Sequence, residues 1–259
     1  MSTQITTQLI KELRDATGIS VMQCKNALTE ADGNMEKALA ILKKTSSDIA
    51  LKKADRNAKD GSVLIKSDEN NAIIISLHCE TDFVSKNEDF ISLLSKLSNI
   101  AFTDGIDKMK SSAKEMIDPI IQKTGEKIEL GEAFKVEGKV LGSYIHNNKS
   151  AVIVSLEGGN TEVAKDIAMH ITAMKPEYLS ADEITEETKK TMQEIFEKEV
   201  ATVDKPEEIK KKMLEGKIST YFKEKTLLNQ PFIKNPNETI GQLLDKSKAK
   251  IIEVKRYSI

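Results

Sequence analysis

The sequence lacks the long apolar runs that mark membrane insertion and secretion. None of its 259 residues falls in a run that approaches the ~18 apolar residues of a membrane span. The first residues, Met1-Ser2-Thr3-Gln4, are not a charged segment followed by an apolar one, so they do not resemble a secretory signal. We therefore expect a cytoplasmic protein that does not enter a membrane.

An excess of positive charge is also missing. The formal net charge is -2, whereas extensive nucleic-acid binding requires many basic residues to neutralise phosphates. A local basic patch is compatible with this total. The charge nevertheless argues against direct nucleic-acid binding as the main function.

Motifs for catalysis and for cofactor binding are absent as well. The sequence contains no GxGxxG, GxxxxGK[ST] or HExxH motif. The cysteines, Cys24 and Cys79, form no CxxC pair and lie in apolar patterns, so we expect buried, reduced thiols. Carboxylates do not cluster around the scattered histidines, so we expect no metal site and no cofactor.

The histidines themselves do not suggest an active site. His78 precedes Cys79, but adjacent strand residues point to opposite faces, which argues against a Cys–His dyad. His170 lies on the apolar side of an expected helix and should be buried. His146 lies in a polar turn and should be exposed. We therefore predict a protein that is not an enzyme.

What the sequence does contain begins with three short amphipathic helices in residues 5–46. Apolar residues at spacings of four precede Gly18, which should end the first helix. Ser20 with Gln23 predicts the start of the second helix, as in a capping box. Asp32-Gly33 should end the second helix, and Asn34 should start the third. The residues expected to line the small core are Ile5, Leu9, Leu13, Val21, Cys24, Ala27, Leu28, Ala31, Met35, Ala38, Leu39 and Leu42.

One apolar residue, Met22, does not fit the stripe of the second helix. It lies about 100° around the helix from Val21, away from the core positions. One interpretation is a single exposed methionine, which is common. The other is an apolar knob, formed with Ile19 and Val21 at the turn after Gly18, that meets a partner.

The middle of the chain alternates strands with helices and repeats part of its own pattern. Strands are expected at residues 62–66 and 72–77, joined by a turn at 68–71, and again near 127–135, 138–147 and 151–156. The strand AIIISL (72–77) resembles AVIVSL (151–156), and a helix follows each. Two such β-β-α units predict a duplicated core.

The two copies differ at the junction between strand and helix. Thirteen positions separate Leu77 from Phe90, but only seven separate Leu156 from Val163. The extra residues surround Phe83, an aromatic in an otherwise polar loop. Phe83 either folds back over the start of the helix or is presented to a protein partner, because aromatic residues at loop tips are favoured anchors.

The predicted fold class is α+β, with five segments. Residues 181–226 carry two charged amphipathic stretches, which predict a projecting helical hairpin whose apolar seam serves its own packing or a dimer contact. The predicted boundaries are 1–46 for the helical module, 47–60 for a basic, helical or flexible linker, 61–137 for the first core unit, 138–180 and 227–259 for the second, and 181–226 for the hairpin.

Eight fragments in the same order resemble the elongation factor Ts family and cover nearly the whole chain. They are LIKELRDATG (9–18), MQCKNAL (22–28), CETDFV (79–84), GSYIH (142–146), MH (169–170), KPEY (175–178), QPF (230–232) and TIGQLL (239–244). The resemblance implies a guanine-nucleotide exchange factor that binds the GDP form of elongation factor Tu, disturbs its Mg²⁺ and phosphate site, and promotes GDP release. It also implies that the N-terminal module is similar to ubiquitin-associated (UBA) domains.

The resemblance also assigns contact residues, in two groups. By match, the TDFV segment approaches the Mg²⁺ site of the partner, and its residues are Thr81, Asp82, Phe83 and Val84. Other matched contacts are Arg14, Val21, Met22, Lys53, Gly125 and His146. Thr124 stands before Gly125 where an apolar residue is common in the family, and we expect no counterpart here of the further C-terminal helix that longer members carry. Both departures bear on the strength of the contact.

Two other functions are compatible with single features of the sequence. A scaffold that binds ubiquitin-like folds through the N-terminal module would leave the duplicated core and the Phe83 segment unexplained. A thiol enzyme that uses Cys79 with His78 would require a reactive thiol of low pKa. For the oligomeric state, the resemblance is compatible with a homodimer or a two-to-two complex with the partner, since some members of the family pair through their helical hairpins or cores.

Overall fold

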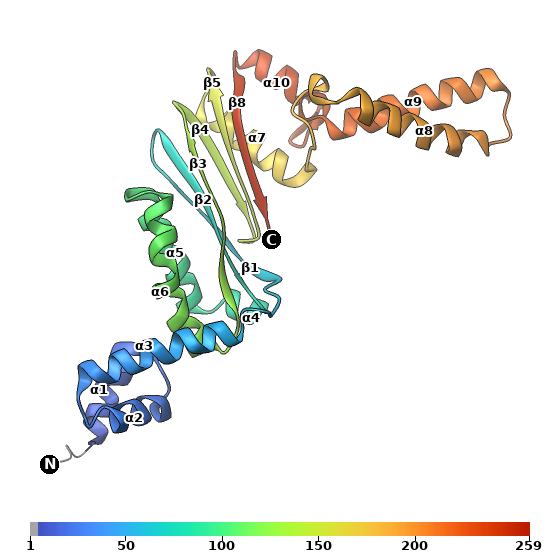
Figure 1. Ribbon diagram of the computed structural model, residues 1–259. Helices are drawn as coiled ribbons and strands as arrows, with labels where there is room; N and C mark the ends of the chain where they lie inside the picture. Colours follow the sequence, from blue (N-terminus) through green and yellow to red (C-terminus); the bar gives the residue numbers. More distant parts are fainter. Residues whose placement is uncertain (1–4) are drawn as a thin grey trace. The chain divides into compact units, whose positions relative to one another are not determined.

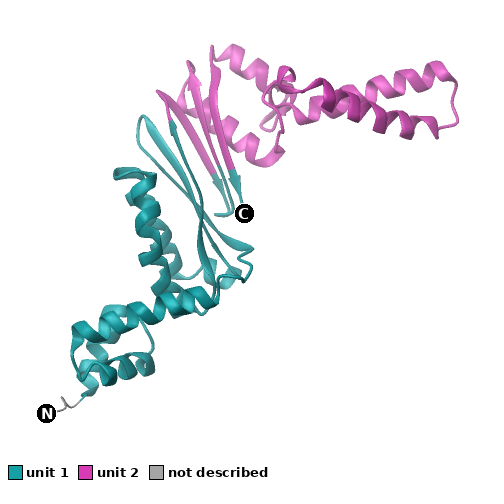
Figure 2. Cartoon of the chain, viewed as in Figure 1, with its two compact units in different colours: residues 1–136, 145–151, 257–259 teal, residues 137–144, 152–256 magenta. Residues whose placement is uncertain are grey.

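The computed structural model describes residues 5–259 and divides the chain into two compact units. Unit 1 comprises residues 1–136, 145–151 and 257–259, and unit 2 comprises residues 137–144 and 152–256 (Figure 2). The class is α+β: helices combine with two three-stranded sheets and one two-stranded sheet in the described residues (Figure 1). The finer division into five segments stays a prediction.

Unit 1 begins with the three predicted helices. They are α1 (Thr7–Thr17), α2 (Val21–Glu30) and α3 (Met35–Lys52). The side chains of Thr6, Ser20 and Asn34 each accept a backbone N–H of the helix that follows, which satisfies a donor that has no partner within the helix. Gly18 ends α1 with φ 69°, a conformation that glycine adopts without strain.

The small core of this module differs from the expectation at three positions. Leu39 was predicted to be buried but is 40% exposed, and Val21 is 51% exposed. Ile19, which one of the two interpretations of Met22 placed in an exposed knob, is buried in the core cluster with Leu13, Cys24 and Leu28. Helix α3 also continues to Lys52, so the first part of the predicted linker is helical.

The rest of unit 1 is a sheet covered by helices. Strands β1 (Asp60–Ser67), β2 (Asn71–Cys79) and β3 (Ile128–Glu137) form a sheet in the order β1-β2-β3. Strands β1 and β2 are antiparallel, with Ser67 opposite Ala72, as the predicted hairpin requires. The helices are α4 (Asp82–Ser85), α5 (Glu88–Thr103) and α6 (Ile106–Thr124).

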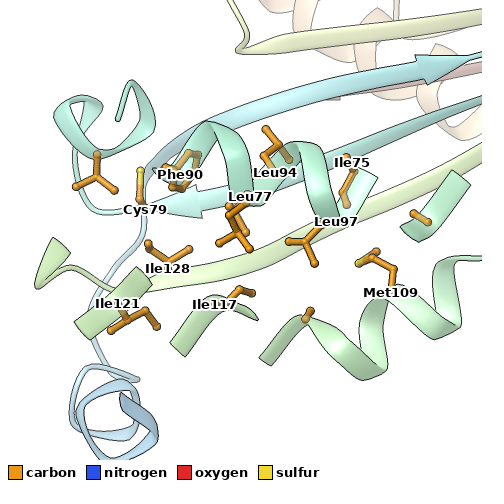
Figure 3. Packing of buried hydrophobic residues seen from close by; sticks show 14 of the residues in the cluster. Ile75, Leu77, Cys79, Phe90, Leu94, Leu97, Met109, Ile117, Ile121 and Ile128 are labelled. Carbon is orange, nitrogen blue, oxygen red and sulfur yellow. The ribbon is translucent and has the colours of Figure 1, made fainter. Parts of the chain in front are cut away.

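The core of unit 1 lies between these helices and the sheet. Figure 3 shows Leu77 of β2 packed among residues of α5 and α6. The predicted helical stripe is fully confirmed, because its members are all at most 4% exposed: Phe90, Leu93, Leu94, Leu97 and Ala101. This core fixes the positions of β2 and α5, and therefore of the segment that joins them.

Unit 2 repeats this arrangement with additional helices. Its strands belong to a sheet of order β4-β5-β8, formed by β4 (Val140–His146), β5 (Ser150–Glu157) and β8 (Lys250–Ser258). The other elements are α7 (Thr161–Met174), α8 (Glu186–Ala201), α9 (Glu207–Lys225), β6 (Pro231–Phe232), β7 (Asn235–Thr239) and α10 (Ile240–Lys246), with short 3-10 turns at Ala181–Glu183 and Leu227–Asn229. Helices α8 and α9 pack together through the rings of Phe196 and Tyr221, 5.6 Å apart. Projection of this pair from the core stays a prediction.

The two sheets share one order, in which the second strand is central and the last strand pairs with it. In unit 2 only residues 158–160 separate β5 from α7, whereas residues 80–87 separate β2 from α5. The extra residues of the first copy contain α4. The length difference seen in the sequence therefore corresponds to one additional helical turn.

Candidate partner-binding site

Helix α4 presents one aromatic side chain to solvent. Phe83 is 84% exposed, the largest fraction among the exposed large apolar residues of the described chain. It does not fold back over the start of α5. Its neighbour Val84 is 8% exposed and packs in the core of unit 1. Successive helical residues are rotated by about 100°, so burying Val84 turns Phe83 outward.

The polar residues of α4 are held by local contacts. Asp82 accepts a hydrogen bond from Lys86 Nζ at 2.7 Å, which raises the pKa of Lys86 above its usual value. Ser85 is buried, and its hydroxyl donates to the carbonyl of Asp82 at 3.1 Å. Hydrogen bonds between residues 82–86 therefore hold the turn, and Asp82 is exposed beside Phe83.

The residue before α4 is tied to a distant turn. Glu126 accepts the backbone N–H of Thr81 at 3.0 Å and its hydroxyl at 2.6 Å. In the opposite direction, Glu80 accepts the backbone N–H of Lys127 at 2.6 Å, which lowers the pKa of Glu80. Arg56 also contacts Glu80 at 3.2 Å. Each of the two segments, 80–81 and 126–127, therefore contributes one carboxylate that accepts hydrogen bonds from the other segment.

Two further predicted contact residues meet at the same turn. Gly125 ends α6 in a left-handed conformation, with φ 76°. Its carbonyl accepts a hydrogen bond from Lys53 Nζ, at the end of α3. Lys53, Gly125 and Thr81 therefore lie in one connected region next to Phe83.

The turn that carries His146 belongs to unit 1 and is linked to the far end of α4. His146 is exposed, as predicted. Lys149 Nζ donates to Asp60 Oδ1 at 2.6 Å and lies 3.4 Å from Ser85 Oγ. Burial raises the pKa of Asp60, but the hydrogen bonds from Lys149, Ser85 and Gly61 outweigh it, and the pKa is lowered overall.

The remaining predicted contacts lie on the surface of the N-terminal module. Arg14 is exposed, and Met22 is 64% exposed beside Val21. Both apolar residues begin α2, directly after the turn at Gly18. The module joins α6 through an ion pair of Lys43 with Glu115 at 3.0 Å.

The sequence does not predict that Lys149 and Arg56 belong to this region, and for Glu126 the resemblance indicates only that its turn lies near the partner, without the contact to Thr81. Glu126 is 45 positions from Thr81, and Lys149 is 64 positions from Ser85. Neither belongs to a periodic pattern. The available signal was the match of the turn at residues 124–126 to a family segment.

The thiol-enzyme hypothesis is contradicted by the surroundings of Cys79. Burial, aided by the negative charges of Asp60 and Glu126, raises the pKa of Cys79 to about 12. The ring of His78 is instead engaged with Tyr257, with Nε2 2.7 Å from the phenol oxygen. A general base for the thiol is therefore not provided by His78.

We expect Cys79 to resist alkylation in the native chain. A pKa near 12 reduces the thiolate fraction roughly a thousandfold relative to an ordinary cysteine, and the thiolate is the reactive form. Iodoacetamide treatment at pH 7.5, followed by peptide mass mapping, should leave Cys79 unmodified in the absence of urea and modify it in urea. Rapid modification of the native chain would contradict the burial.

In the described part of the chain, no helix is long and apolar enough to cross a membrane, and no cluster of three or more candidate ligands could hold a metal ion.

Comparisons with known proteins address the whole chain. A family model described as elongation factor TS matches residues 80–259, and one described as a UBA-like domain matches residues 4–42. Elongation factor Ts of Hahella chejuensis is 39% identical over 98% of this chain and 92% of its own. That of Cellvibrio japonicus is 40% identical over 92% and 84%, and that of Pseudomonas aeruginosa is 38% identical over 99% and 91%. With the UBA-like module and the α+β core in place, the chain belongs to the elongation factor Ts family of translation elongation factors.

Proposed function

We propose that this chain is a guanine-nucleotide exchange factor for the GTPase elongation factor Tu, acting in the cytoplasm during translation elongation. Membership of the elongation factor Ts family supports the partner and the process. One observation carries the mechanism: Phe83 is 84% exposed on a turn whose neighbouring residues are buried or hydrogen-bonded. An exposed aromatic on a fixed backbone is suited to enter a partner, because little conformational entropy is lost when it binds.

The proposed mechanism is thermodynamic linkage and needs no catalytic residue. If the chain binds the nucleotide-free GTPase more tightly than the GDP form, it must weaken GDP binding by the same factor. Each tenfold weakening of GDP binding corresponds to about 1.4 kcal/mol of binding free energy. Disturbing a few of the contacts that hold Mg²⁺ and phosphate is therefore sufficient.

The contact residues take different roles in this proposal. Phe83 enters the GTPase near its Mg²⁺ site, and Asp82 lies beside it to compete for groups that hold the metal or the phosphates. Val84 is buried in the core, so we assign it to anchoring the turn, together with Thr81.

The other predicted residues add binding surface. Arg14, Val21 and Met22 contact the nucleotide domain of the GTPase through the UBA-like module. Lys53 and Gly125 extend this surface towards α4. His146 contacts a different domain of the GTPase. We propose no direct nucleic-acid contact, and a two-to-two complex formed through α8 and α9 remains an alternative to a one-to-one complex.

The decisive experiment measures release of fluorescent GDP from elongation factor Tu. We expect the wild-type chain to accelerate release and Phe83→Ala to lose about tenfold of that acceleration, a typical size for an interface anchor. Because Phe83 is exposed, the free energy of unfolding should change by less than about 0.5 kcal/mol. A matched control is Ile252→Ala, which truncates a side chain that is 57% exposed on β8. This variant should accelerate GDP release as much as the wild type does.

The outcomes separate the function from the mechanism. A wild-type chain that left GDP release unchanged would contradict the exchange function and favour a scaffold that binds ubiquitin-like folds. Full acceleration by Phe83→Ala would keep the function and shift the mechanism to the UBA-like module and His146.

A further inference from the structure

We propose that Glu126 is a positioning residue that sets the orientation of α4 and thereby directs Phe83; this inference rests on the proposed function. The family resemblance matches the turn at residues 124–126 to a segment near the nucleotide pocket of the partner, but it gives the side chain of Glu126 no role towards Thr81. Glu126 is half-buried in the turn after α6, next to Gly125.

The argument begins with the size of α4. The helix has four residues, and its N-cap, Thr81, makes no side-chain hydrogen bond into it. A helix this short does not hold its own direction, because it contains almost no internal hydrogen bonds. Its orientation must therefore come from contacts outside the turn.

Glu126 supplies such a contact at two points of one residue. Its two carboxylate oxygens accept the N–H and the hydroxyl of Thr81, at 3.0 and 2.6 Å. Hydrogen bonds to a charged acceptor are roughly twice as strong as neutral ones. Two bonds to separate groups also fix the rotation of Thr81, two residues before Phe83.

Glu126 can act as an anchor because its own backbone is held. Helix α6 ends at Gly125, whose carbonyl accepts from Lys53, and the N–H of Lys127 donates to Glu80 at 2.6 Å. The carboxylate therefore projects from a turn that is fixed on both sides.

Before Phe83, the thiol of Cys79 also donates to the carbonyl of Thr81 at 3.2 Å, and the remaining contacts outside the turn lie beyond Phe83. Val84 packs in the core, and the carbonyl of Ser85 accepts a hydrogen bond from Ser62 Oγ at 3.2 Å. Phe83 has little packing of its own, since most of its side chain is in solvent. With the far side held at Val84 and Ser85, the two charge-assisted bonds to Glu126, together with the weaker thiol bond from Cys79, set the direction of the backbone that enters the turn.

The experiment compares Glu126→Ala with Glu126→Gln and with a matched control, Glu129→Ala. Glu129 is an exposed carboxylate on β3 whose partner is Lys127 at 2.7 Å, and it has no role in the clamp on Thr81. A glutamine keeps an acceptor for the Thr81 N–H and a polar group for its hydroxyl, so it should restore most of the function. GDP release is measured at several concentrations of each variant, to separate the maximal rate from the concentration for half-maximal effect.

We expect Glu126→Ala to lower the maximal rate of GDP release about tenfold, because Phe83 would no longer be directed correctly into the partner. The concentration for half-maximal effect should change less. In the Phe83→Ala background, Glu126→Ala should cause no further loss, because residues that act through one another are not additive. Glu126→Gln should stay within about threefold of the wild type, and Glu129→Ala should equal it.

A second readout needs no GTPase. Hydrogen exchange of the Thr81 amide in the free chain, followed by NMR, should become about tenfold faster or more in Glu126→Ala, because that N–H loses its acceptor. Exchange in the core strand β2 should be unchanged, which distinguishes a local loss from general unfolding.

Specific results would overturn the inference. These are normal release by Glu126→Ala, an additive further loss in the Phe83→Ala background, or failure of Glu126→Gln to restore release. If the wild-type chain did not accelerate release at all, the proposed function would fall and this inference with it, whereas normal release by Glu126→Ala would remove this inference alone.

Discussion

Gly142→Ala is expected to destabilise unit 2 by about 3 kcal/mol, at the upper end of the usual effects of overpacking. Gly142 is buried on β4, against α7. A Cβ placed there would lie closer than 3.0 Å to the backbone of Ala164 and Lys165. Backbone of a packed helix cannot move aside as the end of a long side chain can, so the strand and the helix must separate.

Urea unfolding followed by circular dichroism measures this effect, and Gly216 provides a control of opposite sign. Gly216 lies within α9, and a Cβ there would meet nothing within 4 Å. Gly216→Ala should therefore stabilise the chain by roughly 0.5–1 kcal/mol, because alanine loses less backbone entropy in a helix. Equal midpoints for Gly142→Ala and the wild type would show that β4 and α7 are less closely packed than the structure indicates.

The second large effect is expected at His170, which is fully buried in unit 2. Its Nδ1 accepts the backbone N–H of Ile233 at 3.3 Å, so its Nε2 carries the proton and donates to Gln230 at 2.9 Å. Gln230 in turn donates to the carbonyl of Glu224 at 2.6 Å. His170→Ala should cost about 3 kcal/mol of unfolding free energy at pH 7.5, because it leaves a cavity and an unpaired buried amide.

The contribution of His170 should depend on pH in a defined direction. Burial lowers the pKa of His170, and the hydrogen bond to Gln230 offsets this only in part. Below the unfolded pKa of about 6.5, the unfolded chain binds a proton that the folded chain does not, so stability is lost as the pH falls towards the folded pKa. Protonation of Nδ1 would also remove the acceptor for Ile233.

Urea unfolding of the wild type and His170→Ala at pH 7.5 and pH 5.5 tests this linkage. The difference in unfolding free energy between the two proteins should be largest at pH 7.5 and smaller at pH 5.5. Only the wild type contains the buried histidine, so only the wild type loses its contribution to stability as the pH falls. An equal difference at both pH values would mean that His170 has the same pKa in the folded and unfolded chain.

Much of the local structure was predictable because it depends on neighbours in the sequence. The starts of α2, α3 and α10 follow from Ser20, Asn34 and Thr239, each of which caps a helix within three residues of itself. The prediction of a buried apolar stripe on α5, beginning at Phe90, is confirmed because a strongly periodic apolar face can be buried in few other ways. The similarity of two strand segments predicted a duplicated core, and the structure adds that the two sheets have the same strand order.

Burial at the edges of elements was less predictable. Leu39 fits the apolar period of α3 and yet is 40% exposed, while Ile19 in a turn is 3% exposed. Periodicity tells which residues share a face of a helix, but the width of the face that is covered depends on the neighbouring elements. The two interpretations of Phe83 could not be separated for the same reason, because they differ only in what lies beside α4.

The sequence by itself determined most of the long helices and strands, the duplicated core and the resemblance to the elongation factor Ts family, since these follow from short-range hydrogen bonding, apolar period and ordered motifs, but it described the helical turn α4 as a loop. Only the tertiary structure decided that Phe83 faces solvent while Val84 is buried, and that Glu126 holds Thr81. The physical reason is distance along the chain: Thr81 and Glu126 are 45 positions apart, and they meet only because the packing of α5 and α6 on the sheet brings the end of α6 to the end of β2.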